Sequence, residues 1–311
     1  MVDPWGAFRF AAGLRTFASK LIRMLSIDPK KVPVARFHGL MLGAVGPRPI
    51  AFASTIDSDG KPNLSPFSFF NVFSANPPIL IFSPARRVRD NTVKHTLLNV
   101  KSVKEVVINI VNYELVQQAS LSSTEFPEGV NEFEKAGLTM LASDMVRPFR
   151  VAESPVQFEC RVREVVSLGQ EGGAGNLVVA EVLKMHIDGT LLDEEGRIDQ
   201  FKIDLVARMG GNWYTRSRMG MFEVPKPLST IGIGVDGLPT EIRQSRILTG
   251  NDLGILGNTE QLPTEDQVAE YLAEYPETAS LDVESRHQLA KEKIEKNNPG
   301  EAWKILMAKK K

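Results

Sequence analysis

Residues 48–71 read RPIAFASTIDSDGKPNLSPFSFFN, and this segment decides how the chain folds. Residues 50–56 are apolar and β-forming, which predicts a buried strand. Residues 57–60 contain an Asp-Gly pair, and such a turn between two strand-forming runs is a strong hairpin signal. We therefore expect a hairpin whose second, extended run becomes aromatic at Phe67, Phe69 and Phe70.

Small polar side chains lie among the apolar residues of this hairpin. They are Ser54, Thr55, Asn63, Ser65, Ser68 and Asn71. Hydroxyls and amides at the rim of an apolar slot suit a flat, apolar ligand that needs a few hydrogen bonds. The alternative is that these strand hydroxyls satisfy neighbouring backbone groups, as most buried hydroxyls do.

The rest of the central region predicts more strands than helices. Strands are expected at 79–82, 106–111, 155–166 and 177–187. Helices are expected from Thr92, with Asp90 or Asn91 as N-cap, and over 113–121 and 131–136. Many strands with few, short helices favour an antiparallel barrel over a parallel α/β sheet.

The two ends of the chain differ from this centre. Residues 1–23 place four basic residues among apolar ones, which is typical of an appended helix or of a targeting or membrane-surface helix. A start at Met24 is a further alternative, and we favour the appended or late-start interpretations. Beyond Tyr214 the chain is rich in proline and glycine, and Thr264 with Gln267 predicts a capping box before an amphipathic helix.

Composition limits the classes of partner. The chain has 311 residues, with 37 Lys and Arg against 38 Asp and Glu, so neither nucleic acid nor an anionic membrane is indicated. Its single cysteine, Cys160, excludes an internal disulfide and suits a reducing, cytoplasmic compartment. The alternating pattern around Cys160 predicts a structural, half-buried thiol.

Two sequence features resemble functional motifs but give little support for a function. Residues 232–237 fit G-x-G-x-x-G, but no clear strand precedes them and no long helix follows, so a turn-rich loop is expected. The four histidines and one cysteine show no metal-ligand spacing, and we expect no metal site.

The central region resembles the flavin reductase-like family, whose members have an FMN-binding split β-barrel. The segments that carry the resemblance are RPIA at 48–51, ST at 54–55, NLSPFSFFN at 63–71, PP at 77–78, KHT at 94–96, VIN at 107–109, VNEFE at 130–134, ESPVQFE at 153–159 and RMGG at 208–211. Many pieces in the right order make chance a poor explanation, although no single piece is diagnostic.

The resemblance implies a mainly β fold with peripheral helices, in which an antiparallel, Greek-key split barrel carries an irregular, helical C-terminal extension. The expected divisions are an N-terminal extension over 1–33, the flavin-binding barrel over 34–220 and the C-terminal extension over 221–311. It also implies a homodimer, in which a cleft between subunits completes a shallow site.

The same resemblance implies FMN as cofactor. The residues expected at its ring and ribityl chain are Ser54, Thr55, Ser65, Pro66, Phe67 and Ser68. Those expected near its phosphate are Arg89, Asn91, Thr92, Lys94 and Thr96, with Arg86 and Arg87 close by. The family has Lys-Asp-Thr where this chain has Lys94-His95-Thr96, so Lys94 and Thr96 are carried over and His95 is not. The alternative is an ordinary capped helix beside an Arg-rich surface loop.

Two further elements have open roles. His186 is our candidate catalytic residue, near the nicotinamide or acceptor side of the flavin, and the alternative is a half-exposed strand histidine. Gly210 and Gly211 permit close backbone approach, for packing or for the cofactor.

The function implied is hydride transfer from NADH or NADPH to flavin, and onward to a small-molecule or redox-protein acceptor. The alternatives are a flavin-bound electron carrier without a nicotinamide site, and a flavin- or tetrapyrrole-binding module without turnover.

Overall fold

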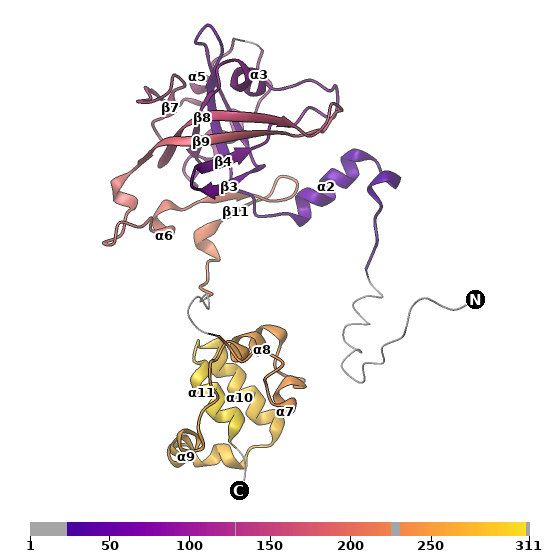
Figure 1. Ribbon diagram of the computed structural model, residues 1–311, viewed down its shortest axis with the longest axis vertical. Helices are drawn as coiled ribbons and strands as arrows, with labels where there is room; N and C mark the ends of the chain where they lie inside the picture. Colours follow the sequence, from indigo (N-terminus) through magenta and orange to yellow (C-terminus); the bar gives the residue numbers. More distant parts are fainter. Residues whose placement is uncertain (1–23, 128, 225–230, 309–311) are drawn as a thin grey trace, which may run out of the picture. The chain divides into compact units, whose positions relative to one another are not determined.

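The computed structural model describes residues 24–127, 129–224 and 231–308 (Figure 1). Residues 1–23, which carry the predicted targeting or appended helix, lie outside them. The chain divides into a unit of Ser26–Phe222 and a second unit that contains Glu223–Lys311, each with its own hydrophobic core. Among the described residues, no helix is both long and apolar enough to cross a membrane.

The first unit is built on one seven-stranded antiparallel sheet with the strand order β2-β1-β5-β8-β9-β4-β3. Its strands are β1 (Ala51–Ile56), β2 (Pro62–Phe67), β3 (Phe70–Ala75), β4 (Pro78–Phe82), β5 (Glu105–Ile110), β8 (Val156–Ser167) and β9 (Asn176–Ile187). Side chains from β1, β2, β4, β5, β8 and β9 meet in one buried cluster, so the sheet wraps around its core. This is the mainly antiparallel fold that the sequence predicts.

The hairpin of residues 51–67 forms as expected. β1 pairs with β2 from Ala51↔Phe67 to Ile56↔Pro62, and every residue of β1 is buried. The carboxylate of Asp57 accepts the N–H groups of residues 59 and 61, each at 2.9 Å, and Gly60 adopts a φ of 84°. The turn residues therefore fix the register of the hairpin.

The aromatic run was predicted as one extended segment, and this is wrong. The chain bends after Phe67 and returns as β3, which pairs with β4 and not with β2. In the strand order, β3 forms one edge of the sheet and β2 the other. The residues of β3 are mostly exposed.

Short elements surround the sheet. The helices are α2 (Val34–Ala44), α3 (His95–Ser102), α4 (Val116–Leu121), α5 (Glu132–Ala136) and α6 (Gln200–Ile203), with 3-10 turns η1 (Pro29–Lys31), η2 (Gly189–Leu191) and η3 (Ser217–Met219). The remaining strands form two small ribbons, β6 (Met140–Leu141) with β7 (Arg150–Val151) and β10 (Val206–Arg208) with β11 (Tyr214–Arg216).

The predicted start of α3 is wrong by three residues. The helix begins at His95, with Lys94 as N-cap, and not at Thr92. The carboxylate of Asp90 bonds Thr92, and Asn91 has a φ of 58°, so these residues form a turn of their own.

The second unit is helical. Its elements are α7 (Thr240–Arg243), α8 (Gly250–Gly257), α9 (Glu265–Glu274), η4 (Pro276–Ser280), α10 (Val283–Glu295) and α11 (Pro299–Met307). Trp303 is buried at its centre among leucine and isoleucine side chains. Thr264 and Gln267 form the predicted capping box, and the glycine motif at 232–237 forms the expected turns.

Candidate functional site

A small hollow lies where β2, the start of α3 and the loop after α4 meet. Its lining residues are Asn63, Ser65, Arg87, Lys94, His95, Thr96, Ser122, Thr124, Glu125, Phe126 and Glu132. Its volume is about 30 Å³, whereas pockets that enclose a whole ligand measure about 300–1,000 Å³. The hollow therefore has room for a charged head group and not for an aromatic ring.

Lys94 is a cation that the fold holds in this hollow. Its Nζ atom lies 3.2 Å from the hydroxyl of Ser65 and 5.5 Å from the centre of the Phe67 ring. Burial, followed by the positive charge of Arg87, lowers the pKa of Lys94. An anion in the hollow would stabilise the charged form of Lys94, because water solvates this ammonium group poorly.

Two arginines of the preceding loop share one carboxylate. The Nε atom of Arg87 donates to Oε1 of Glu125 at 2.8 Å, and Nη2 of Arg89 donates to its Oε2 at 3.0 Å. Hydrogen bonds from Arg89 and then Arg87 lower the pKa of Glu125, so the carboxylate is ionised. Arg89 is also paired with Asp90 at 3.0 Å.

The other residues expected at a phosphate are bonded to their own loop. Thr92 donates its hydroxyl to Asp90 at 2.6 Å, which lowers the pKa of Asp90 to about 2. Asn91 accepts from Nε of Arg86 at 2.6 Å and donates to the carbonyl of Gln170 at 3.1 Å. These contacts shape the loop that presents Arg87 and Lys94.

Two of the predicted hydroxyls belong to a buried polar network. The amide of Asn63 donates to Thr96 at 2.9 Å and to Thr55 at 3.3 Å, and Asn99 also donates to Thr55, at 3.1 Å. Thr55 and Thr96 are fully buried. These hydroxyls satisfy neighbouring polar groups, as one of the two interpretations from the sequence expects, and the network fixes α3 against β1 and β2.

Ser54 differs from its neighbour Thr55. Successive side chains of a strand point to opposite faces, so the two hydroxyls lie on opposite sides of β1. Ser54 is fully buried, and its Oγ atom has no hydrogen-bond partner among the described residues.

The end of β2 leads from the core to the surface. Phe67 is buried against Phe82, with ring centres 5.4 Å apart. Pro66 and Ser68 are half-buried and Phe69 is exposed, beside the ring of His38 at 6.1 Å. This segment offers apolar surface next to the hydroxyl of Ser65.

Gly210, the first of the paired glycines, has a packing role, whereas Gly211 adopts a positive φ of 58°. Arg48 donates to the carbonyls of Leu42, Val45 and Met209, and so ties the end of α2 to the loop that contains the glycines. A Cβ atom on Gly210 would lie 3.0 Å from Cα of Gly43. Close approach of two backbones therefore explains this glycine.

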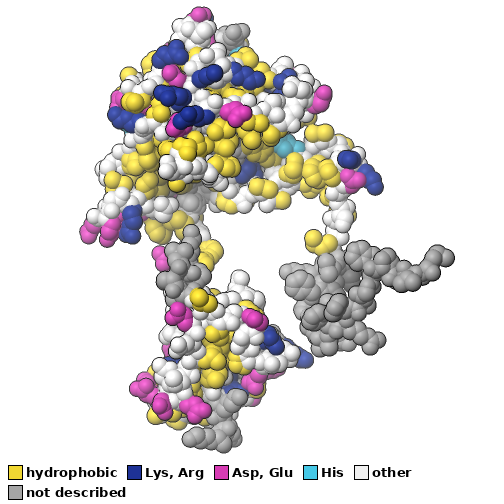
Figure 2. Space-filling model, in the orientation of Figure 1, with side chains coloured by type: hydrophobic (Ala, Val, Ile, Leu, Met, Phe, Trp, Pro, Cys, Tyr) yellow, Lys and Arg dark blue, Asp and Glu magenta, His cyan; other side chains and the backbone are white. Residues whose placement is uncertain are grey.

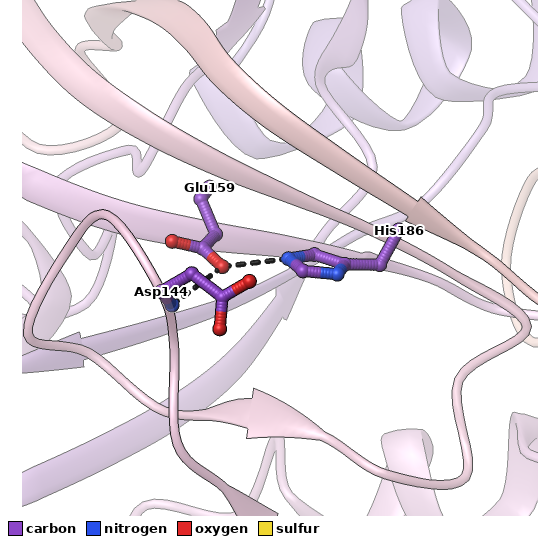
Figure 3. Close-up of side chains that lie close together, drawn as sticks. All are labelled: Asp144, Glu159 and His186. Carbon is purple, nitrogen blue, oxygen red and sulfur yellow. Dashed lines mark hydrogen bonds and ion pairs between the residues drawn. The ribbon is translucent and has the colours of Figure 1, made fainter.

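His186 lies in a different part of the barrel. It lines a polar hollow of about 660 Å³ together with Arg150, Gln157, Asp204 and Arg216, and this hollow shares no lining residue with the one around Lys94. The Nε2 atom of His186 lies 2.7 Å from Oε1 of Glu159 (Figure 3). The structure therefore separates the candidate catalytic residue from the candidate phosphate residues within the described chain.

Glu159 is fully buried and holds His186 in place. Its carboxylate also accepts the N–H groups of Asp144 at 2.9 Å and Met145 at 2.5 Å. Burial alone would raise the pKa of Glu159, but these hydrogen bonds and His186 outweigh it, so the pKa lies below its ordinary value. Because an ionised carboxylate can only accept, Nε2 of His186 carries the proton in this contact.

Asp144, Glu159 and His186 bring ligand-type atoms within 4.8 Å of one another. Other cations already occupy their surroundings, since Lys184 pairs with Asp144 at 2.5 Å and Arg150 lies 3.9 Å from Glu159. We interpret the group as an ion network that positions His186, and we assign no metal to it.

Sequence reasoning missed the loop that closes the hollow. Ser122, Thr124 and Glu125 come from the segment after α4, far from Lys94 in the sequence. No local pattern marks them, and the fold alone brings them to Arg87. The Cys160 thiol is fully buried, not half-buried, and burial raises its pKa, which agrees with a structural role.

Comparison with known proteins gives a consistent match over the first unit. The model of the flavin reductase like domain matches residues 44–202. An uncharacterized protein of Aquifex aeolicus is 40% identical over 180 residues, which cover 58% of this chain and 89% of that protein.

Solved structures are also similar to this chain over much of its length. Nitrilotriacetate monooxygenase component B from Bacillus cereus is similar with a TM-score of 0.61 and 28% identity, over 65% of this chain and 98% of that one. The 2-nitrobenzoate 2-nitroreductase NbaA of Pseudomonas fluorescens is similar with a TM-score of 0.58 and 25% identity, over 68% of this chain and all of that one. The helical elements from residue 240 onward lie outside the matched domain.

Proposed function

Because the chain belongs to the flavin reductase-like family, we propose that it is an FMN-dependent oxidoreductase that takes hydride from NADH or NADPH. The electrons would pass to a small-molecule acceptor or a redox protein, in the cytoplasm. The observation that carries the proposal is the hollow around Lys94, where Lys94 and Arg87 bring cations together beside apolar surface at the end of β2.

The donor set fits a flavin mononucleotide. Arg87 and Lys94 bring positive charge to the hollow, and Ser65 with Thr124 brings hydroxyls that can donate to phosphate oxygens. The first turn of α3 has no side-chain cap and its residues His95 and Thr96 line the hollow, so its free N–H groups would be available to the phosphate. The half-buried surface of Pro66 and Ser68 would border the ring.

The flavin, when bound, supplies the redox chemistry by accepting and releasing hydride or single electrons. The chain would contribute binding, orientation and electrostatics. His186, whose Nε2 proton is donated to the buried Glu159, would present its ring in a fixed orientation to the polar hollow, where a donor or acceptor molecule could be bound.

We test this function by anaerobic absorption spectroscopy of the purified protein with added FMN. Flavin bands that bleach within seconds of adding NADH or NADPH support it. Bands that persist with both nucleotides, but bleach with a reduced redox protein, favour an electron carrier. A protein that binds no flavin contradicts the proposal.

Replacing Lys94 by glutamine is expected to weaken FMN binding by about ten- to thirty-fold, because one charge-assisted contact to a phosphate is lost. Riboflavin, which lacks the phosphate, should bind both proteins within two-fold of each other. Quenching of flavin fluorescence measures both affinities. The matched control is Lys101→Gln, an exposed lysine of the same helix α3. An equal loss for riboflavin would show that Lys94 supports the fold and does not bind phosphate.

We also propose that the protein is a homodimer. Ile79 and Ile81 of β4 and Val179 of β9 point to the outside of the sheet, and the neighbouring edge strand β3 adds the exposed side chains of Val72 and Phe73. Figure 2 shows hydrophobic side chains gathered on this face. A contiguous apolar surface of this kind is typical of a subunit interface.

Ile81→Asp is expected to shift the protein from dimer to monomer, because a carboxylate would be buried without a partner in the interface. Sedimentation velocity measures the change, and circular dichroism should show an intact fold. Leu98→Asp serves as the control, because Leu98 is an exposed apolar residue of helix α3 and not of β4 or β9. A wild-type protein that sediments as a monomer would contradict the dimer.

A further inference from the structure

The carboxylate of Glu125 occupies the place where the proposed site would hold a phosphate. It lines the hollow together with Lys94 and Thr124. Its two oxygens each accept from a different arginine, Oε1 from Arg87 and Oε2 from Arg89. Guanidinium groups bind carboxylates and phosphates with the same forked set of N–H donors.

The same donors cannot serve both anions fully. The Nε atom of Arg87 is 2.8 Å from Glu125, while its Nη1 atom is held by Thr92 and by the carbonyl of Val93 at 2.8 and 3.1 Å. Nη1 is therefore occupied, and the remaining fork of this guanidinium, Nε with Nη2, already gives its Nε donor to Glu125. A phosphate bound to both donors of that fork would have to replace the carboxylate at Nε.

The environments of the two carboxylates in the hollow also indicate that Glu125 is the one that competes with an anion. Glu132, the other acid of the lining, bonds the N–H of Leu64 at 3.0 Å, and burial raises its pKa. Glu125 is half-exposed and is the lining carboxylate whose oxygens are hydrogen-bonded to arginines, and these hydrogen bonds lower its pKa. Removing that charge would release the Nε donor of Arg87 beside Lys94, while Arg89 would keep Asp90 as its partner.

We propose that Glu125 is a built-in competitor for the flavin phosphate, and that it sets how strongly this protein prefers FMN to riboflavin. This inference rests on the proposed function. Glu125 lies in the loop between α4 and α5 and is about half exposed, so it can turn toward water when a phosphate takes its place. Binding of FMN then costs the two Glu125 ion pairs, whereas binding of riboflavin leaves them intact.

The test compares FMN and riboflavin affinities of the full-length wild-type protein and of Glu125→Gln, by fluorescence quenching in low salt. Glutamine keeps the size of the side chain and removes its charge. Because exposed ion pairs are each weak, we expect FMN to bind about three- to ten-fold more tightly to the variant, with riboflavin unchanged. The gain should shrink at about 0.5 M salt, where surface charges are screened.

Glu195→Gln is the matched control, because Glu195 forms an exposed pair of the same kind with Arg197, at 2.7 Å, outside the hollow. It should change neither affinity. Thermal unfolding followed by circular dichroism checks that both variants are folded, and Glu125→Ala provides a second variant with the same expected direction.

Three outcomes overturn the inference. Unchanged or weaker FMN binding in Glu125→Gln shows that Glu125 does not compete, while the proposed function stands. An equal gain for both flavins shows that the loop, and not the phosphate contact, has changed. A wild-type protein that binds neither flavin removes the proposed function itself, and this result is separate from any effect of the substitution.

Discussion

Replacing Glu159 by alanine is expected to lower the free energy of unfolding of the barrel by about 4 kcal/mol, because removing one partner of a buried charge network leaves the others unsatisfied. The change deletes the acceptor for the N–H groups of Asp144 and Met145 and for Nε2 of His186. Urea unfolding followed by circular dichroism measures the difference. Glu164→Ala is the control, since Glu164 is exposed on the same strand β8, and it should change stability by less than about 0.5 kcal/mol.

The loss from Glu159→Ala should also depend on pH. The pKa of Glu159 in the folded protein lies below its ordinary value of 4.5. A carboxyl group with a depressed folded pKa stabilises the protein above its unfolded pKa, and this contribution disappears as the pH falls through the folded pKa. The difference between wild type and variant should therefore be full at neutral pH and shrink below pH 4.5. A difference that is the same at both ends of this range would indicate a packing defect and not a lost charge network.

The fold could be predicted where the signals are local. The hairpin of residues 51–67 follows from its turn chemistry, and the helix at 132–136 follows from its cap at Asn131 and the left-handed Gly137. β3 was missed because nothing between Phe67 and Phe70 marks a turn in the sequence. Its separate identity depends on β4, which pairs with it through the turn at residues 76–77.

The proximity of some candidate site residues could be predicted for the same reason, and their role in binding stays a prediction. Ser65, Lys94 and Thr96 all line one hollow, where the hydroxyl of Thr96 accepts from Asn63. The opposite directions of Ser54 and Thr55 follow from strand geometry alone and were available from the sequence. The position of Glu125 was not, because it depends on how the loop after α4 folds back onto the arginines.

Arg286→Ala is expected to destabilise the helical unit by about 3 kcal/mol, because a buried backbone acceptor loses its donor and a cavity forms. Arg286 is buried on α10, where it donates to the carbonyl of Ala308 and, at 3.2 Å, to Glu241 of α7. Ala308, at the end of α11, is itself fully buried. The side chain of Arg286 thus links α7 and the end of α11 to α10.

Hydrogen exchange read by mass spectrometry distinguishes this effect from a general loss of stability. Because the two units have separate cores, peptides from α8, α10 and α11 should exchange faster in Arg286→Ala, and peptides from β5 and β8 should not. Arg246→Ala is the control, since Arg246 is an exposed arginine of the same unit. Arg286→Met keeps most of the volume but supplies no donor, so it should recover only part of the protection. Full recovery with methionine would mean that Arg286 acts by filling space and that its bond to Ala308 contributes little.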